Sequence, residues 1–283
     1  MEDSVKDHNA LITDGWFIAY VVMDGIYRIS DHGNSNLYLV IGEKAAVLID
    51  TGYGNSGLSN FINRLTSLPL TVVNSHGHFD HSFGNDQFDT VYIGRGDMPL
   101  LNYAEHDIMK EYIENVGSLI GDARALPFKN MWGVPARIEN AFILDSMKFD
   151  LGGEVLNAHL VPGHSRGSVC FYAEKAGVLF VGDSYVPLEY WGPMWFHNEN
   201  CAPLSDFYKS MSCLTDLKGI KYMLSGHGEC GLLPISRLDT LLKGVERVIA
   251  GKEVGIPEET LIGTGMRIDW ADVGIVYDPK NIQ

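Results

Sequence analysis

The feature that most constrains the fold is a recurring pattern of apolar segments that each end in a loop carrying His or Asp. Such loops occur at residues 50, 76–81, 164, 183 and 227. The segments before them, such as Ala46-Val-Leu-Ile and Val178-Leu-Phe-Val, have the composition of buried strands. In α/β sheets, ligands gather outside the strand ends. If these strands share one sheet edge, five distant segments converge on one place.

The order of the segments predicts an α/β fold. Apolar runs predict strands, and apolar residues at helical spacing predict helices. A strand–helix–strand order near the N-terminus indicates βαβ units. The expected strands cover residues 38–41, 46–49, 70–73, 90–93, 155–161, 169–172, 178–181 and 222–225. The expected helices cover residues 57–66, 97–117, 205–217 and 235–250, and residues 265–277 are expected to form a closing hairpin.

No clear linker interrupts the chain, so residues 1–283 are interpreted as a single domain. A partly helical excursion is expected around residues 97–140, because residues 117–140 are irregular and contain Pro127, Trp132, Gly133 and Pro135. After residue 230 we expect a C-terminal helix followed by the hairpin.

The segment His76-Gly-His-Phe-Asp-His81 carries the strongest chemical signal. It offers three imidazoles and a carboxylate within six residues, and these are preferred ligands of zinc and similar first-row ions. Gly77 allows a tight turn, so His76 and His78 can face a common point. A loop that enters a helix allows Asp80 and His81 to face a second point.

This motif resembles the signature of the metallo-β-lactamase superfamily, and the other elements follow in that family's order. Asp50 lies in Asp-Thr-Gly, His164 in Pro-Gly-His-Ser, Asp183 in Gly-Asp-Ser and His227 in Gly-His-Gly, so the resemblance spans roughly residues 35–230. It implies the four-layer αββα sandwich of that family. It also implies two divalent metal ions, zinc first and iron or manganese as alternatives, since identical ligands serve all three.

The resemblance assigns a role to each residue of the motif. His76, His78 and His164 would hold the first ion, and Asp80, His81 and His227 would hold the second. Asp183 would bridge both ions. Asp50 would orient the motif loop, since metal-bound histidines need a hydrogen-bond partner that fixes their tautomer.

A metal-dependent hydrolase is the function that this set implies. Two ions about 3.5–4 Å apart can share a water and lower its pKa from ~16 towards ~7, so that hydroxide attacks an electrophilic carbonyl or phosphorus. Asp80 and Asp183 would reduce the charge of the site, and one of them or a water would protonate the leaving group. True β-lactamases of this type usually carry Cys or Ser at the position of Asp183, so the sequence looks more like the glyoxalase II and lactonase branch.

The loop that follows Asp183 is rich in aromatic residues. Tyr185 is a candidate donor to a developing oxyanion and is counted among the catalytic candidates with Asp80 and Asp183. An apolar substrate pocket is the second hypothesis for this loop, the alternative being that it packs on the sheet. The candidate pocket residues are Tyr190, Trp191, Trp195, Phe196 and His197.

Composition limits the partners. The net charge is −15 and no basic face is evident, which argues against nucleic acid as substrate. No apolar run is long enough to span a membrane, and the acidic N-terminus lacks the apolar stretch of a signal peptide. We therefore expect a cytoplasmic enzyme with reduced, mostly buried cysteines and a small-molecule substrate. The sequence leaves the oligomeric state open.

The leading hypothesis for the substrate is a small ester, thioester or lactone. The alternatives are a phosphodiesterase or nuclease on the same scaffold, and a persulfide dioxygenase with a single iron. Glyoxalase II itself is disfavoured, because the tail after His227 is short and ends in the expected hairpin. A non-enzymatic binding protein is disfavoured because the full ligand set is present.

Overall fold

The computed structural model describes residues 10–54, 57–101, 141–143, 147–228, 231–260 and 262–283. Within these ranges the strands form sheets of eight, six and four strands. In the first sheet the strands follow chain order: β1 (Ala10–Thr13), β2 (Phe17–Met23), β3 (Ile26–Asp31), β4 (Ser35–Ile41), β5 (Ala46–Ile49), β6 (Leu70–Val73), β7 (Val91–Ile93) and β8 (Ala141–Ile143).

The second sheet has the order β15-β14-β12-β11-β10-β9. Its strands are β9 (Lys148–Asp150), β10 (Val155–Leu160), β11 (Val169–Ala173), β12 (Val178–Gly182), β14 (Tyr222–Ser225) and β15 (Leu233–Pro234). Because β10 and β12 each pair antiparallel with β11, and β12 pairs parallel with β14, strands β10, β12 and β14 run in the same direction.

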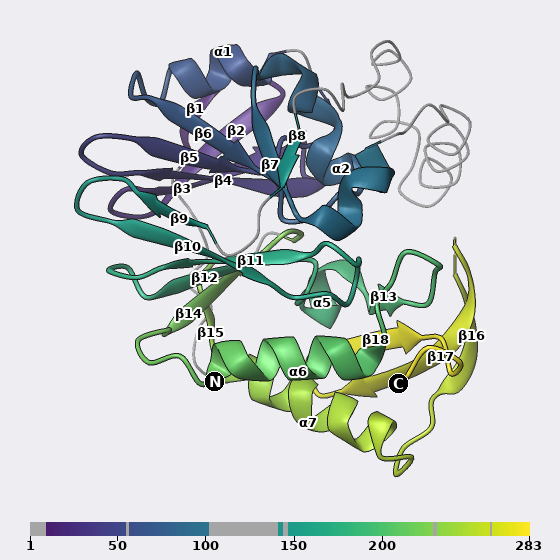
Figure 1. Ribbon diagram of the computed structural model, residues 1–283. Coiled ribbons are helices and arrows are strands. Elements are labelled where there is room, and N and C mark those ends of the chain that lie inside the picture. Colours follow the sequence, from purple (N-terminus) through teal and green to yellow (C-terminus); the bar gives the residue numbers. More distant parts are fainter. Residues whose placement is uncertain (1–9, 55–56, 102–140, 144–146, 229–230, 261) are drawn as a thin grey trace.

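The helices lie on the outer faces of these two sheets (Figure 1). Helices α1 (Leu58–Asn63) and α2 (Phe79–Ser82) and the 3₁₀ helices η1 (Phe83–Gln87) and η2 (Arg95–Leu101) follow strands of the first sheet. Helices α6 (Leu204–Thr215) and α7 (Arg237–Ile249) cover the second sheet. The short helix α5 (Leu188–Trp191) lies in the loop after β12. The four-layer αββα arrangement expected from the sequence is confirmed.

Alternation of side chains along the strands builds three buried interfaces in the described part of the chain. On β5, Val47 and Ile49 point into the space between the sheets, where they meet Phe171 and Phe180. The intervening Leu48 packs with Phe61 on the outer face.

The interface under the second sheet is the largest and joins it to α6 and α7. Leu179 and Val181 of β12 cluster there with Phe207, Met211 and Leu241 of the two helices. Each layer is therefore bound to the next by apolar surface removed from water, which is the main driving force for folding.

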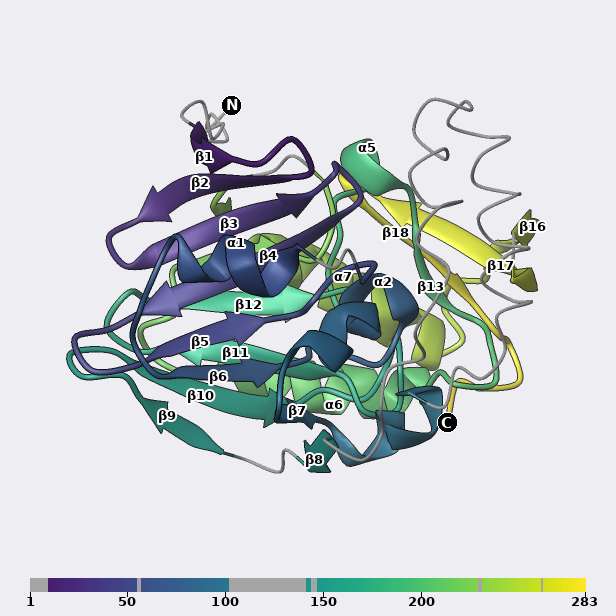
Figure 2. The same ribbon diagram turned by 90° about the horizontal axis from the view of Figure 1, so that it is seen from above.

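A third sheet packs beside the sandwich, with strand order β13-β18-β17-β16. It consists of β13 (Met194–Phe196), β16 (Ile256–Thr260), β17 (Gly263–Trp270) and β18 (Val273–Tyr277). The expected hairpin is the antiparallel pair β17–β18. The sequence pattern did not indicate β16, nor that β13, within the aromatic loop, pairs parallel with β18. Figure 2 shows this sheet beyond the ends of the main strands, on the side of α2 and α5.

Several sequence predictions need correction or fall outside the described ranges. The helix expected over residues 97–117 is a 3₁₀ helix as far as residue 101. Residues 102–140, which carry most of the expected excursion, lie outside the described ranges. No helix within the described ranges is long and apolar enough to cross a membrane. Of the described cysteines, Cys170 and Cys201 are free and buried, and Cys213 is free and exposed.

Candidate metal centre

The seven predicted ligands meet at one end of the sandwich, where strands of the two sheets end. The segment 76–81 follows β6 and enters α2, while His164, Asp183 and His227 follow β10, β12 and β14. The two sheets are also joined directly here, because the backbone N–H of Asn36 donates to the carbonyl of Gly226. The convergence expected from the strand ends is therefore observed.

Three imidazoles form the first group of the cluster. The Nδ1 atom of His78 lies 3.0 Å from Nε2 of His76 and 3.0 Å from Nε2 of His164. The three nitrogens together form a set that could hold a metal ion.

Asp80, His81 and His227 form the second group. Nε2 of His81 and Nε2 of His227 lie 3.2 Å apart, and Oδ2 of Asp80 lies 3.3 Å from the latter. This set also has the composition and spacing to hold an ion. Asp80 and His81 are adjacent in the chain, and both reach the cluster because α2 begins at Phe79.

Asp183 lies between the two groups. Its Oδ2 atom is 3.6 Å from Nε2 of His164 and 3.1 Å from Nε2 of His227. Its Oδ1 atom is 3.4 Å from Nε2 of His81, is buried, and accepts no hydrogen bond from the described residues. A buried carboxylate oxygen without a donor is costly unless a cation neutralises it, so this position suits a metal ion.

Hydrogen bonds behind the cluster fix the tautomers of two histidines. Nδ1 of His164 lies 2.9 Å from the carbonyl of Trp195, and Nδ1 of His227 lies 2.7 Å from the carbonyl of Asn34. A carbonyl can only accept, so each Nδ1 carries the proton and donates it, which leaves the Nε2 lone pair facing the cluster. Such an arrangement is typical of metal-binding histidines. The donor set therefore fits divalent metal ions.

The carboxylate of Asp50 contacts both ends of the motif loop. Its carboxylate accepts hydrogen bonds from the backbone N–H of Ser75 at 2.6 Å and from the Ser75 hydroxyl at 2.7 Å. Nδ1 of His81 lies 2.9 Å from the same carboxylate. Asp50 adopts a φ of 67°, a left-handed conformation that aspartate tolerates better than most residues.

The two groups differ in their affinity for protons. Burial, followed by neighbouring imidazoles, holds the pKa of His76 well below its ordinary value and lowers the pKa of His78 to about 3. Burial also opposes protonation of His81, but the carboxylates of Asp80, Asp183 and Asp50 outweigh it and raise the pKa of His81 to about 9. The first group thus offers neutral lone pairs, while the carboxylates of the second group require positive charge nearby.

A mostly apolar cavity of about 260 Å³ opens onto the cluster. Among its walls are Trp191 and Trp195 from the predicted aromatic loop, together with Asp80 and Asp183. Trp191 is 43% exposed and stacks on the ring of His227, with the ring centroids 4.1 Å apart. No Lys or Arg occurs among the described residues that line the cavity.

The remaining residues of the aromatic loop lie elsewhere. Tyr185 is fully buried in the core, and its hydroxyl donates to Asp272 at 3.3 Å, so the structure does not bring it to the cluster. Phe196 packs on Phe207 of α6, and Nε2 of His197 lies 2.7 Å from the hydroxyl of Thr260. These residues and Tyr190 are not among the residues that line the described cavity.

One buried carboxylate that the sequence analysis missed supports the loop of Asp50. Asp31 accepts a hydrogen bond from the backbone N–H of Tyr53 at 2.7 Å and another from the indole N–H of Trp16. Burial raises the pKa of Asp31 to about 6 although both donors favour its charged form, and the negative charge of Asp80 adds to the rise.

We expect the free energy of unfolding of the metal-free protein to depend on pH through the ionisation of Asp31. The folded chain binds this proton more tightly than the unfolded chain, so ionisation of Asp31 lowers the free energy of unfolding as pH rises from about 4 to about 6. The full effect is about 3 kcal/mol. Between pH 4 and pH 7, Asp31→Asn should therefore gain up to that amount relative to the wild type. Urea unfolding at several pH values tests this expectation, and a difference independent of pH would contradict it.

Comparison with known proteins gives a consistent result. Residues 30–221 match the family model described as Metallo-beta-lactamase superfamily. Acyl-coenzyme A thioesterase MBLAC2 of Homo sapiens is 30% identical over 188 residues, which cover 59% of this chain and 66% of that protein, just under two thirds of its length. The same thioesterase of Gallus gallus is 28% identical over 75% of this chain and 80% of its own length.

Solved structures show the same fold. A metallo-beta-lactamase family protein from Thermus thermophilus superposes with a TM-score of 0.56 and 22% identity, over 82% of each chain.

Proposed function

The chain belongs to the metallo-β-lactamase superfamily, and we propose that it is a hydrolase whose seven clustered ligands hold two divalent metal ions, zinc first, and whose substrate is a small acyl thioester. Esters and lactones of similar size are the related substrates of this proposal, and the cytoplasm is the compartment that it implies. The observation that carries the proposal is the position of Asp183, whose two oxygens reach both groups of imidazoles.

Metal ions in such a site, when bound, make water more acidic and polarise a carbonyl oxygen. His76, His78, His164 and Asp183 would hold one ion, and Asp80, His81, His227 and Asp183 the other. The backbone carbonyls of Asn34 and Trp195 keep two of these imidazoles in the required tautomer. The chain itself therefore supplies a preorganised, charge-balanced site.

The cavity determines which part of a substrate the protein buries. The apolar side chains of its walls suit an acyl chain, and Trp195 is one of two indoles among them, the other being the stacked Trp191. The carboxylates of Asp80 and Asp183 line the same cavity, so the carbonyl of a bound substrate can reach the proposed ions. A neutral acyl chain that carries one electrophilic carbonyl meets both conditions.

A thioester also suits the site because its leaving group does not need a proton donor. A thiol has a pKa of roughly 8.5, so a thiolate leaves near neutral pH without prior protonation. The leaving group of an ester or lactone is more basic, and Asp80 is poorly suited to protonate it, because His81 and His227 outweigh burial and hold the pKa of Asp80 below its ordinary value. The relatives whose printed name is acyl-coenzyme A thioesterase support the choice of thioester.

A substrate panel tests the proposal with zinc-loaded protein. It contains acyl-coenzyme A thioesters, the same acyl groups on the uncharged thiol N-acetylcysteamine, p-nitrophenyl esters, a lactone, a p-nitrophenyl phosphodiester and a structured RNA. We expect the highest kcat/KM with thioesters and negligible cleavage of RNA. Because the chain carries a charge of −15, the uncharged thioester should be favoured over the coenzyme A thioester most strongly at low salt.

Two results would overturn this assignment. Cleavage of the phosphodiester or RNA without hydrolysis of any carbonyl substrate would favour a phosphodiesterase or nuclease. Consumption of oxygen by iron-loaded protein with glutathione persulfide, without hydrolysis of thioesters, would favour a persulfide dioxygenase.

We expect Trp195→Ala to raise KM about 10-fold for an octanoyl thioester and to change kcat little. The side chain would contact the acyl chain equally in the ground and transition states, so its loss removes uniform binding. The carbonyl of residue 195 still accepts the hydrogen bond of His164 in this variant. The acetyl thioester serves as the matched control, because it has no chain to bury, and an equal rise in its KM would contradict the acyl-pocket interpretation.

A further inference from the structure

A buried carboxylate outside the predicted ligand set joins two loops of the metal centre. Asp97 of η2 is fully buried. Its Oδ2 atom accepts hydrogen bonds from the backbone N–H of Gly77 at 2.7 Å and from the hydroxyl of Ser165 at 2.6 Å. Its Oδ1 atom accepts a hydrogen bond from the backbone N–H of Gly167 at 2.6 Å.

The backbone around Asp97 is packed too closely for side chains. A Cβ atom at Gly94 would lie 2.0 Å from the carbonyl oxygen of Gly167, and one at Gly167 would lie 2.4 Å from the backbone nitrogen of Asp97. A Cβ atom at Gly77 would lie 3.0 Å from Cβ of Asp97. Glycine thus permits the turn before Asp97 to touch both loops, so the carboxylate has little freedom to move.

The partners of Asp97 are neighbours in sequence of the first group of imidazoles. Gly77 lies between His76 and His78, and Ser165 follows His164. The three hydrogen bonds of Asp97 reach neither Asp80, His81 nor His227. We propose that Asp97 is a positioning residue that sets the separation of His164 from His76 and His78, and so determines the affinity of the first metal site. This inference rests on the proposed function, in which that group binds an ion.

The chemistry of the three donors explains why a carboxylate is needed. An ionised carboxylate accepts at both oxygens, whereas an amide accepts at one and donates at the other. In Asp97→Asn, the new NH₂ group must face the backbone N–H of either Gly77 or Gly167, whichever way the amide is turned. A buried N–H then loses its acceptor, and the two loops lose part of their connection.

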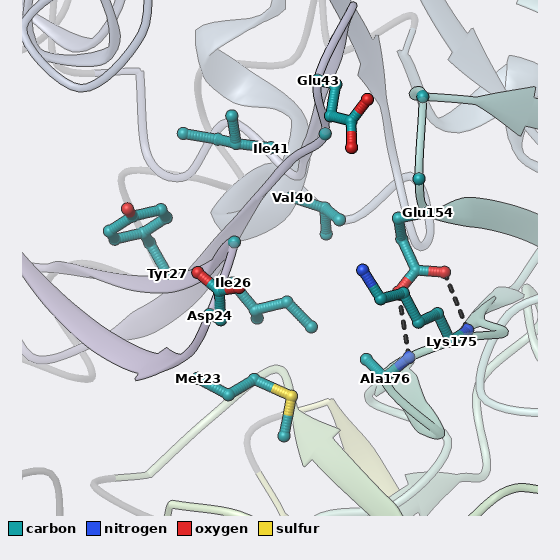
Figure 3. Close-up of a pocket in the computed structure, with 14 residues that line it drawn as sticks. Met23, Asp24, Ile26, Tyr27, Val40, Ile41, Glu43, Glu154, Lys175 and Ala176 are labelled. Carbon is teal, nitrogen blue, oxygen red and sulfur yellow. Dashed lines mark hydrogen bonds between the residues drawn. The ribbon is translucent and has the colours of Figure 1, made fainter.

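Glu154 provides a matched control at the other end of the sandwich. Its carboxylate also accepts three backbone N–H groups, from Val155 at 2.8 Å, Lys175 at 2.9 Å and Ala176 at 3.0 Å. Figure 3 shows it beside a cavity of about 520 Å³ that the turn between β2 and β3 and the end of β4 also line. Glu154→Gln disturbs the same kind of loop connection far from the imidazoles.

Zinc affinity, measured by competition with a chromophoric chelator, tests the inference in two backgrounds. His81→Ala disables the second group, so the first site is measured, and His78→Ala disables the first group, so the second site is measured. In the His81→Ala background, Asp97→Asn should weaken zinc binding by about 10- to 100-fold, the range typical of lost partners behind metal ligands. In the His78→Ala background it should change the affinity by less than about threefold. Glu154→Gln should change neither affinity.

The milder variant Ser165→Ala keeps the test decisive if Asp97→Asn folds poorly. It removes one of the three donors and should weaken the first site by a smaller factor in the same background. Unchanged first-site affinity in both variants, or equal weakening of both sites, would overturn the inference. Failure of the wild type to bind zinc would instead overturn the proposed function, so the two failures are distinguishable.

Discussion

Replacement of Asp183 by Asn is expected to lower kcat/KM for thioester hydrolysis on the order of 10³-fold, the upper end of losses seen when one preorganised electrostatic group is removed. It is also expected to reduce the metal content from two ions per chain to about one. Burial raises the pKa of Asp183, but the imidazoles of His227 and His81 outweigh it and hold the pKa well below its ordinary value. The side chain is therefore charged throughout any practical assay range, and Asn removes that charge while keeping the shape.

The geometry explains why both properties should change together. Asp183 is the carboxylate whose two oxygens reach both groups, at 3.6 Å from His164 and 3.4 Å from His81. Without it, the first group retains three neutral imidazoles and can still hold an ion, whereas the second group keeps Asp80, His81 and His227. Two cations would then share a site with one fewer negative charge, so the weaker one should dissociate.

Elemental analysis and steady-state kinetics measure the two effects on the same preparations. The control is Glu154→Gln, which removes a partly buried carboxylate that accepts backbone hydrogen bonds away from the cluster, and it should keep both zinc ions and wild-type kcat/KM. Near-native turnover by Asp183→Asn would rule out the proposed role of this residue. Loss of turnover with two ions retained would separate catalysis from metal binding.

The main layers could be predicted because their signals are local. The run Ala46–Ile49 is short, apolar and followed by a turn, and Leu58, Phe61 and Ile62 recur at helical spacing. These segments form β5 and α1 as expected, and β5 pairs parallel with β6. Burial of strands on both faces leaves continuous apolar runs, which are easy to recognise.

Of the third sheet, only the hairpin β17–β18 could be predicted, because the pairing of β13 with β18 is not local. Trp195 of β13 pairs with Val276 of β18, far along the chain. The segment 194–196 is short and lies in a loop rich in aromatic residues and prolines, so neither length nor alternation identifies it as a strand. The same packing removes Tyr185 from the cluster, since its hydroxyl turns toward Asp272 between β17 and β18.

The candidate ligands could be predicted, whereas most of their supports could not. A short motif dense in His and Asp is difficult to explain by packing alone, so the segment 76–81 could be recognised from the sequence as a candidate metal-binding motif. The groups that orient His164 and His227 are backbone carbonyls of Trp195 and Asn34, which have no sequence signature. In the sequence, Asp97 resembles any aspartate at the start of a helical segment. Its contacts with the loops of Gly77 and Gly167 become visible only in the folded chain.

Removal of the metal ions is expected to abolish hydrolysis and to lower the melting temperature on the order of 10 °C. An ion that binds the folded state at about 1,000 times its Kd contributes about 4 kcal/mol, so two such ions contribute about 8 kcal/mol. For a chain of 283 residues, each kcal/mol shifts Tm by roughly 1–2 °C. Dialysis against a chelator, followed by calorimetry with and without added zinc, measures the shift.

The cluster explains why the chain should depend on its ions for stability as well as for chemistry. Asp50, Asp80 and Asp183 place three carboxylates around His81, whose pKa of about 9 shows that they require a nearby positive charge. Without metal, protons on the imidazoles meet part of this need, and two ions meet it more fully. The dependence should therefore grow as pH rises from about 6.5 to about 9, where the unfolded chain has lost the proton that His81 still holds in the folded chain. A metal-free protein that melts at the same temperature as the zinc-loaded protein would contradict the presence of ions in this buried cluster, whatever its activity.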